Sequence, residues 1–119
     1  MANIADCVVA ISKGTPRELV KQISNKINEC AYEYRCDEPV YHDECITFDF
    51  GGRWDFPEAI ENYLNDLDIA WQGAGVEDGC DWRYEFGNED FGLRIVPANE
   101  IDESNDPNWH AIDLREDLL

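Results

Sequence analysis

One uninterrupted stretch, residues 46–68, constrains the fold more than any other part of the chain. Its first five residues, ITFDF, alternate apolar and polar side chains, which is the period of two that a strand with one buried face shows. We expect Gly51-Gly52 to end this strand. The sequence therefore predicts a strand and a tight turn that lead directly into a helix.

The helix that follows has a recognisable start. Asp55 and Glu58 have the spacing of a capping box, and Pro57 suits the first turn, where a missing N–H costs nothing. An apolar stripe recurs at steps of three and four residues, and we expect it to face the core: Phe56, Ala59, Ile60, Tyr63, Leu64 and Leu67. The other side is polar and acidic: Glu58, Glu61, Asn62, Asn65 and Asp66.

The N-terminal part predicts a second strand and helix. Residues 7–11, CVVAI, are apolar on both faces, which indicates a central strand that stops at Lys13-Gly14. Residues 15–18, TPRE, form a capping box with proline at the first helical position. The apolar periodicity that follows predicts a helix from about Pro16 to Tyr34.

The remaining segments predict a loop and more strands. Residues 35–45 break both periodicities and should form a surface loop. We expect a strand to begin at residues 69–71 and to meet a flexible break at residues 73–75, GAG. Residues 81–86 and 91–96 alternate around the turn at 87–90, so they predict an antiparallel hairpin with aromatic side chains paired across it.

These elements predict an α+β two-layer sandwich in the order β-α-β-α-β-β-β, a ferredoxin-like variant with two helices on one face of a mainly antiparallel sheet. We expect residues 1–119 to form a single domain. Residues 98–119 form an acidic tail, either a short helix or extended, which could dock through Trp109, Ile112 and Leu114. Among the other aromatic residues, Trp71, Trp82 and Tyr84 are expected in the core or in cross-strand pairs, and Trp54 could equally be a surface anchor or a lid on the core under the turn.

The net charge of −18 does not indicate disorder, because 44% of the residues are hydrophobic and 12% are aromatic. It argues against direct binding to nucleic acid or to an anionic membrane. The N-terminus has no basic region followed by an apolar run, and no stretch reaches the length of a membrane span. The expected location is the cytoplasm, the host's if the protein is phage-encoded, with reduced cysteines.

The charge is unevenly distributed along the chain. Residues 1–35 carry five basic and four acidic residues, whereas residues 36–119 carry four arginines and 23 acidic residues. Carboxylates about 5–6 Å apart on a helix can match the spacing of phosphates in a nucleic acid. Such a surface could occupy a basic DNA- or RNA-binding channel, although an acidic run is also an ordinary solvated surface.

Other chemistry is less strongly indicated. Zinc needs four converging ligands, but Cys30, Cys36, His42 and Cys45 lack a C-x2-C pair. A Cys–His nucleophile pair using His42 or His110 would lack the elbow that presents a nucleophile. Two acidic turns could bind hard cations, although neither has the spacing of a calcium loop: Glu77-Asp78-Gly79 with Asp81, and Glu89-Asp90. We therefore expect no catalytic residue, metal or cofactor.

Residues 50–57, FGGRWDFP, followed by an amphipathic helix and a later Asp90-Phe91-Gly92, resemble the YubB-type ferredoxin-like domains of bacteriophages and plasmids. The resemblance covers about residues 46–96. It implies a mobile-element origin and a split βαβ-like sandwich, and it supplies no catalytic residues. The acidic loop and tail depart from the pattern of that family.

The expected function is that of a non-enzymatic acidic inhibitor. It would block the basic nucleic-acid-binding surface of a host defence complex, such as a CRISPR effector, through exposed carboxylates and an aromatic anchor. The predicted contact residues are Glu58, Glu61, Asp66, Asp68, Glu77, Asp78, Glu89, Asp90 and Trp54. The alternative is an interaction or structural module without catalytic activity, acidic for solubility, which could form a homodimer through the hairpin edge.

Overall fold

The computed structural model describes residues 4–32, 35–36, 38–53, 56–77, 84–89, 91, 93–95 and 112–114. These residues form an α+β fold with an antiparallel five-stranded sheet and a separate two-stranded sheet. The elements are β1 (Ile4–Ser12), α1 (Arg17–Cys30), β2 (Val40–Tyr41), β3 (Cys45–Arg53), α2 (Glu58–Asp66), β4 (Trp71–Glu77), β5 (Tyr84–Gly87), β6 (Leu93–Ile95) and β7 (Ile112–Leu114).

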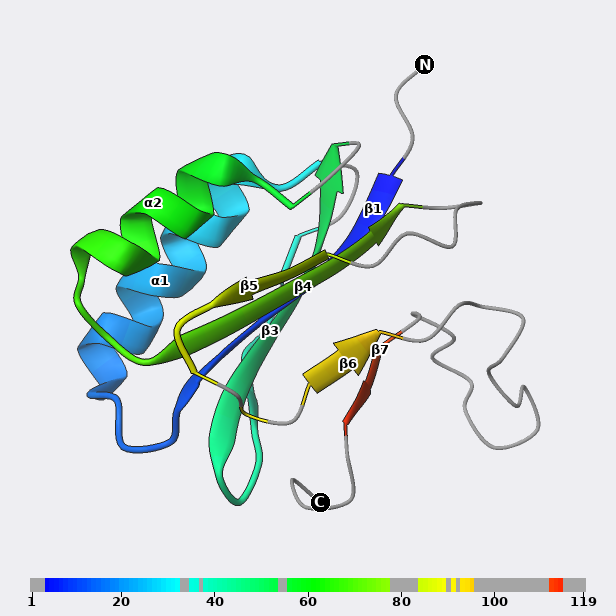
Figure 1. Ribbon diagram of the computed structural model, residues 1–119. Coiled ribbons are helices and arrows are strands. Elements are labelled where there is room, and N and C mark those ends of the chain that lie inside the picture. The colour runs from blue at the N-terminus through cyan, green and yellow to red at the C-terminus, as the bar shows by residue number, and fades with distance from the viewer. Residues whose placement is uncertain are drawn as a thin grey trace.

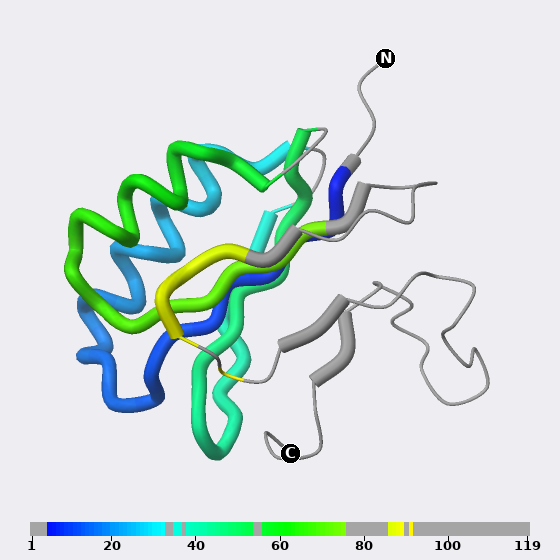
Figure 2. Tube along the Cα trace, viewed as in Figure 1, coloured from blue at the N-terminus to red at the C-terminus, as the bar shows by residue number. Residues whose placement is uncertain are grey.

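Both helices lie on the same face of the five-stranded sheet (Figure 1), as the sequence predicts. The strand order is β2-β3-β1-β4-β5, with α1 packed against β3 and α2 against β5. Strands β3 and β4 flank β1, and both run antiparallel to it. They are therefore parallel to each other and are joined through α2, as the trace in Figure 2 shows.

The central position predicted for the first strand is confirmed. Val9 on the helix side of β1 is fully buried, and Val8 on the opposite side is 1% exposed. The opposite side also receives the chain beyond β5, because the Phe91 backbone N–H donates to Oε1 of Gln72 at 2.7 Å. A strand covered on both faces needs the unbroken apolar run seen in the sequence.

Two glycine segments continue strands that we expected them to interrupt. β3 passes through Gly51-Gly52 as far as Arg53, where it pairs with Ile4. β4 likewise runs through residues 73–75, which pair with β1 and are buried. The prediction of a flexible break there is wrong. A Cβ on Gly73 would lie 2.8 Å from the Phe56 ring, so glycine makes room for an aromatic side chain above the strand.

The predicted hairpin between residues 81–86 and 91–96 is also wrong. β5 forms its ladder with β4, with Gly73 opposite Phe86. β6 pairs with β7 instead, and Leu93 lies opposite Leu114. The alternation in each segment correctly indicates a strand, but alternation does not specify a partner. Part of the acidic tail therefore belongs to a sheet, whereas Trp109 lies outside the described residues.

The helix starts differ from the predicted capping boxes. α1 begins at Arg17 after Pro16, without a side-chain cap, and the Thr15 hydroxyl donates to the Ser12 carbonyl at 2.7 Å. α2 begins after Pro57, also without a side-chain cap, and Asp55 lies outside the described residues. Proline precedes both helices by one residue, which its fixed φ permits.

The first helix is shorter than predicted, and the loop after it contains a strand. α1 ends at Cys30, because Ala31 is already extended. Residues 40–41 form β2, which pairs with β3 at the edge of the sheet. In α2 the predicted stripe holds at Ile60 and Leu64, which are fully buried, whereas Ala59 is exposed.

Candidate functional site

Among the described residues, four aromatic rings form a cluster at the start of α2. The Phe56 ring stacks on Phe86 with 4.8 Å between ring centroids and on Trp71 with 6.1 Å. It meets Phe50 edge-on at 6.0 Å. Such ring pairs contribute beyond the area that they bury. They join the start of α2 to β3, β4 and β5, and so fix this helix on the sheet.

Hydrogen bonds that involve Asn65 and Asn88 fix the other end of α2. The Trp71 indole donates to Oδ1 of Asn65 at 2.9 Å. The Trp71 backbone N–H donates to Oδ1 of Asn88, whose amide donates to the Ile69 carbonyl, both at 3.0 Å. The turn after β5 is thereby tied to the segment after α2. This arrangement places Glu89, whose own backbone N–H donates to the Trp71 carbonyl at 3.2 Å, on the same side as α2.

Acidic side chains surround the aromatic cluster and the asparagine hydrogen bonds. Glu58, Asp66 and Asp68 are exposed, Glu61 is half-buried, and Glu89 is exposed. We define the acidic side as residues 56–70 and 86–89. It contains five acidic residues and no lysine or arginine.

The acidic residues of α2 are not neutralised by other described residues. Glu58, Glu61 and Asp66 form no ion pair with any residue in the described part of the chain. The same holds for Asp68, which has a left-handed backbone with φ of 55° just beyond the helix. Four carboxylates thus remain available to an external cation, which is the property that the predicted contact surface requires.

The structure brings together only some of the predicted contact residues. Asp66 and Asp68 lie near the Asn88 connection and therefore near Glu89, whereas Glu77 ends β4 at the opposite end of that strand. With about 3.3 Å per residue, β4 separates its two ends by roughly 20 Å. Trp54, Asp78 and Asp90 lie outside the described residues.

The side formed by α1 and β2 has a mixed charge. We define the mixed side as residues 13–32, 35–36 and 38–45, which contain five basic and five acidic residues. Lys26 pairs with Glu29 at 3.7 Å, and its ammonium lies 5.7 Å from the centroid of the Tyr63 ring on α2. One of its cations therefore also contributes to the contact between the helices.

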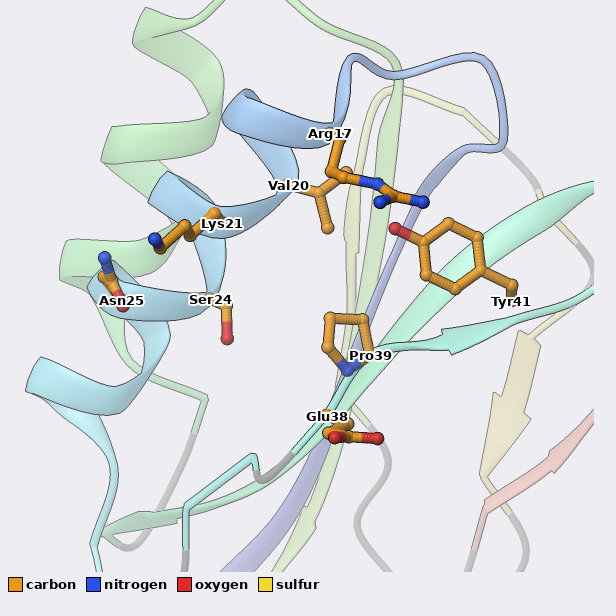
Figure 3. Close-up of a pocket in the computed structure, with 8 residues that line it drawn as sticks. All are labelled: Arg17, Val20, Lys21, Ser24, Asn25, Glu38, Pro39 and Tyr41. Carbon is orange, nitrogen blue, oxygen red and sulfur yellow. The ribbon is translucent and has the colours of Figure 1, made fainter.

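A groove of about 530 Å³ lies on the mixed side between α1 and the segment that includes β2. In Figure 3 the guanidinium of Arg17 extends toward the phenol of Tyr41, and Glu38 lies at the far end. The lining residues are Arg17, Val20, Lys21, Ser24, Asn25, Glu38, Pro39 and Tyr41. This groove was not predicted, because residues 35–45 were expected to form a surface loop. The sequence feature that could have indicated it is the apolar pair Val40-Tyr41 directly after Pro39.

The four residues weighed as zinc ligands do not converge. Cys36 is buried in the core on the helix side, whereas Cys45 is on the opposite face of the sheet, with Thr47. His42 Nε2 forms a hydrogen bond with the Thr47 hydroxyl at 2.9 Å. Within the described part of the chain, no three metal-ligating side chains form a group.

The thiol of Cys45 is unsuited to nucleophilic chemistry. Burial raises its pKa, and the negative charge of Glu44 raises it further. A nucleophilic cysteine needs the opposite shift, toward the thiolate. The other histidine considered as its partner, His110, lies outside the described residues.

Comparisons with protein-family models, curated proteins and solved structures give no match to this chain. None of the helices described here has the length and apolar character needed to cross a membrane.

Proposed function

We propose that this protein is a non-enzymatic acidic inhibitor that occupies a basic nucleic-acid-binding surface on a host protein. The observation that carries the proposal is the uniform sign of the acidic side, where α2 presents carboxylates that no described cation neutralises. Arginine and lysine side chains that normally hold phosphates would pair with these carboxylates. A phage or plasmid origin, and a defence complex such as a CRISPR effector as the target, belong to this proposal.

The rigidity of the acidic side supports this function. Glu58 and Glu61 are three residues apart on one helix, so their spacing does not depend on a flexible loop. The aromatic cluster holds that helix on the sheet. A preorganised row of charges loses less entropy on binding than a flexible acidic tail. The resemblance of residues 46–96 to the YubB-type ferredoxin-like domains supports the proposed origin.

The test combines competition with matched charge reversal. Host protein captured by the wild-type chain should be released by added double-stranded DNA. The variant Glu58→Lys, Glu61→Lys, Asp66→Lys should lose capture while keeping its circular dichroism spectrum. A control, Glu18→Lys, Asp43→Lys, Glu44→Lys, changes the net charge equally at three exposed residues of the mixed side and should retain capture.

The outcomes separate a specific surface from bulk charge. Equal loss in both triple variants would mean that net charge alone governs capture. Retained capture by the α2 variant would exclude the acidic side as the contact surface. If DNA releases nothing, the captured surface is not one that binds nucleic acid.

A second candidate function, a self-associating module, is favoured by a different observation. Val40 and Tyr41 on edge strand β2 are 49% and 53% exposed, and exposed apolar side chains favour packing between chains. This edge replaces the hairpin edge expected from the sequence. Sedimentation of the wild type and of Val40→Lys distinguishes the two: a dimer that Val40→Lys dissociates supports the module, and a monomer at all concentrations rules it out.

A further inference from the structure

The groove between α1 and β2 has the volume of a small-molecule site. Its volume of about 530 Å³ falls within the roughly 300–1,000 Å³ that ligand pockets occupy. Val20, which is 3% exposed, supplies a buried apolar residue of the lining. Ser24 and Asn25 add neutral polar groups from the next turn of the same helix.

Two cations of α1, Arg17 and Lys21, line this groove. They are four residues apart on the helix, and Figure 3 shows the Arg17 guanidinium extending toward Tyr41 while the Lys21 side chain extends away from it. Neither forms an ion pair with another described residue. In a protein with a net charge of −18, acidic residues are abundant, so an unpaired arginine and lysine on one groove are unexpected from composition alone. Their chemistry suits an anion with several oxygen acceptors, since guanidinium binds phosphate in a bidentate manner.

Tyr41 supplies a flat surface beside these cations. Its register partner is Ile46, which belongs to the core on the helix side, so the Tyr41 side chain leaves the sheet on the side of α1. Figure 3 shows its ring facing the groove beside Arg17. Tyr41 is 53% exposed, which leaves room for a planar ligand group to stack on its ring.

Pro39 argues against a different use of this edge. β2 is two residues long, and the proline directly before it has no N–H to donate to an added strand. Short edge strands and edge prolines are devices that prevent strand addition. The exposure of Tyr41 is therefore better explained by a ligand in the groove than by a strand paired to the edge.

We propose that this groove binds a mononucleotide, with its phosphate on Arg17 and its base stacked on Tyr41. Glu38 at the far end of the groove orients the ligand, because its carboxylate repels the phosphate and leaves the Arg17 end as the favourable position. The proposed site is on the mixed side and does not use the carboxylates of α2, so it is independent of the inhibitor function.

The test is a titration of the ¹⁵N-labelled full chain with adenosine 5′-monophosphate, followed by amide chemical shifts. Saturable shifts should appear in the first two turns of α1 and at residues 38–41. Adenosine and ribose 5-phosphate, which lack the phosphate and the base respectively, should each bind at least about fivefold more weakly. Equal binding of either compound would overturn the proposal, as would the absence of saturable shifts in the groove.

Matched variants distinguish binding in the groove from an effect of net charge. Arg17→Gln should weaken binding about tenfold or more through the lost charge-assisted bonds. Lys13→Gln removes the same charge from an exposed residue outside the groove and should change binding less than about twofold. Tyr41→Ala should weaken binding about fivefold or more. Equal effects of Arg17→Gln and Lys13→Gln, or no effect of Tyr41→Ala, would contradict a built site.

Discussion

The two sides of the helical layer differ in both charge and construction. The acidic side has carboxylates of one sign over a frame of stacked rings and asparagine hydrogen bonds. The mixed side balances five basic with five acidic residues and opens into a groove. Chain-wide net charge therefore describes neither side. The comparison indicates that acidity on α2 is a local property with a rigid support, which bulk solubility would not require.

The largest loss of stability is expected from a substitution in the turn that follows β5, on the acidic side. Gly87 has φ of +108°, and a Cβ there would lie 2.3 Å from the Trp71 carbonyl oxygen. Gly87→Ala should lower the free energy of unfolding by about 2–4 kcal/mol, because backbone strain and a steric clash add. Urea denaturation measures this loss.

Gly14→Ala is the control on the mixed side. A Cβ there would lie 3.8 Å from the nearest atom, Oγ of Ser12, so the change should stay within about 0.5 kcal/mol. Similar losses of unfolding free energy in both variants would mean that the two sides tolerate an added Cβ equally. That result would contradict the difference in their construction.

A second, smaller effect concerns the aromatic cluster. The Cβ of Gly73→Ala would meet atoms of Phe56 and Trp71 at 2.8 Å. These rings can shift, unlike the carbonyl at Gly87, so we expect a loss of about 1–3 kcal/mol in the free energy of unfolding. Near-ultraviolet circular dichroism should change with it. An unchanged spectrum and unchanged stability would show that the rings do not pack closely on this strand.

A third effect concerns the turn that carries Glu89. Asn88→Ala removes both side-chain hydrogen bonds to the segment at Ile69 and Trp71, which should cost about 1–3 kcal/mol. Asn88→Asp keeps the acceptor for the Trp71 N–H and should cost less. Hydrogen exchange at Trp71 provides the local measurement. Protection that survives in Asn88→Ala would show that the turn is held by other contacts.

The smallest effect is a pH dependence that comes from Cys45. The pKa of Cys45 is raised in the folded chain, so the unfolded thiol ionises first as pH rises. The thiol therefore contributes stability below the unfolded pKa, and that contribution is lost as pH rises through the folded pKa. Compared with Cys45→Ala, the wild type should lose more stability between neutral pH and pH values above the unfolded thiol pKa. Parallel curves would contradict the shift.

The sequence predicts which segments are strands and helices better than it predicts how they are connected. Runs such as residues 7–11 and 46–50 show a burial pattern directly, because each residue's face depends on local spacing. Pairing depends on distant partners, so the partners of β5 and β6 were predicted wrongly. Gly73 was misjudged because the Phe56 ring that lies over it comes from a residue far away in the sequence.

The candidate contact surface was predictable in part. Charge asymmetry identifies the acidic residues of α2, and the helical period places Glu58 and Asp66 on its exposed side. The link between Glu89 and the end of α2 depends on Asn88, whose hydrogen bonds span 17 and 19 residues. The groove needs an edge strand of two residues, which is too short to produce a periodic signal.

The most direct measurement is the salt dependence of binding to the captured host protein. If carboxylates of the acidic side replace phosphates, the logarithm of the association constant should fall steeply with the logarithm of salt concentration. The variant with Glu58, Glu61 and Asp66 reversed to lysine should lose most of that slope, and the variant reversed at Glu18, Asp43 and Glu44 should keep it. A slope that is shallow in the wild type, or that falls equally in both variants, would contradict a specific acidic contact surface on α2.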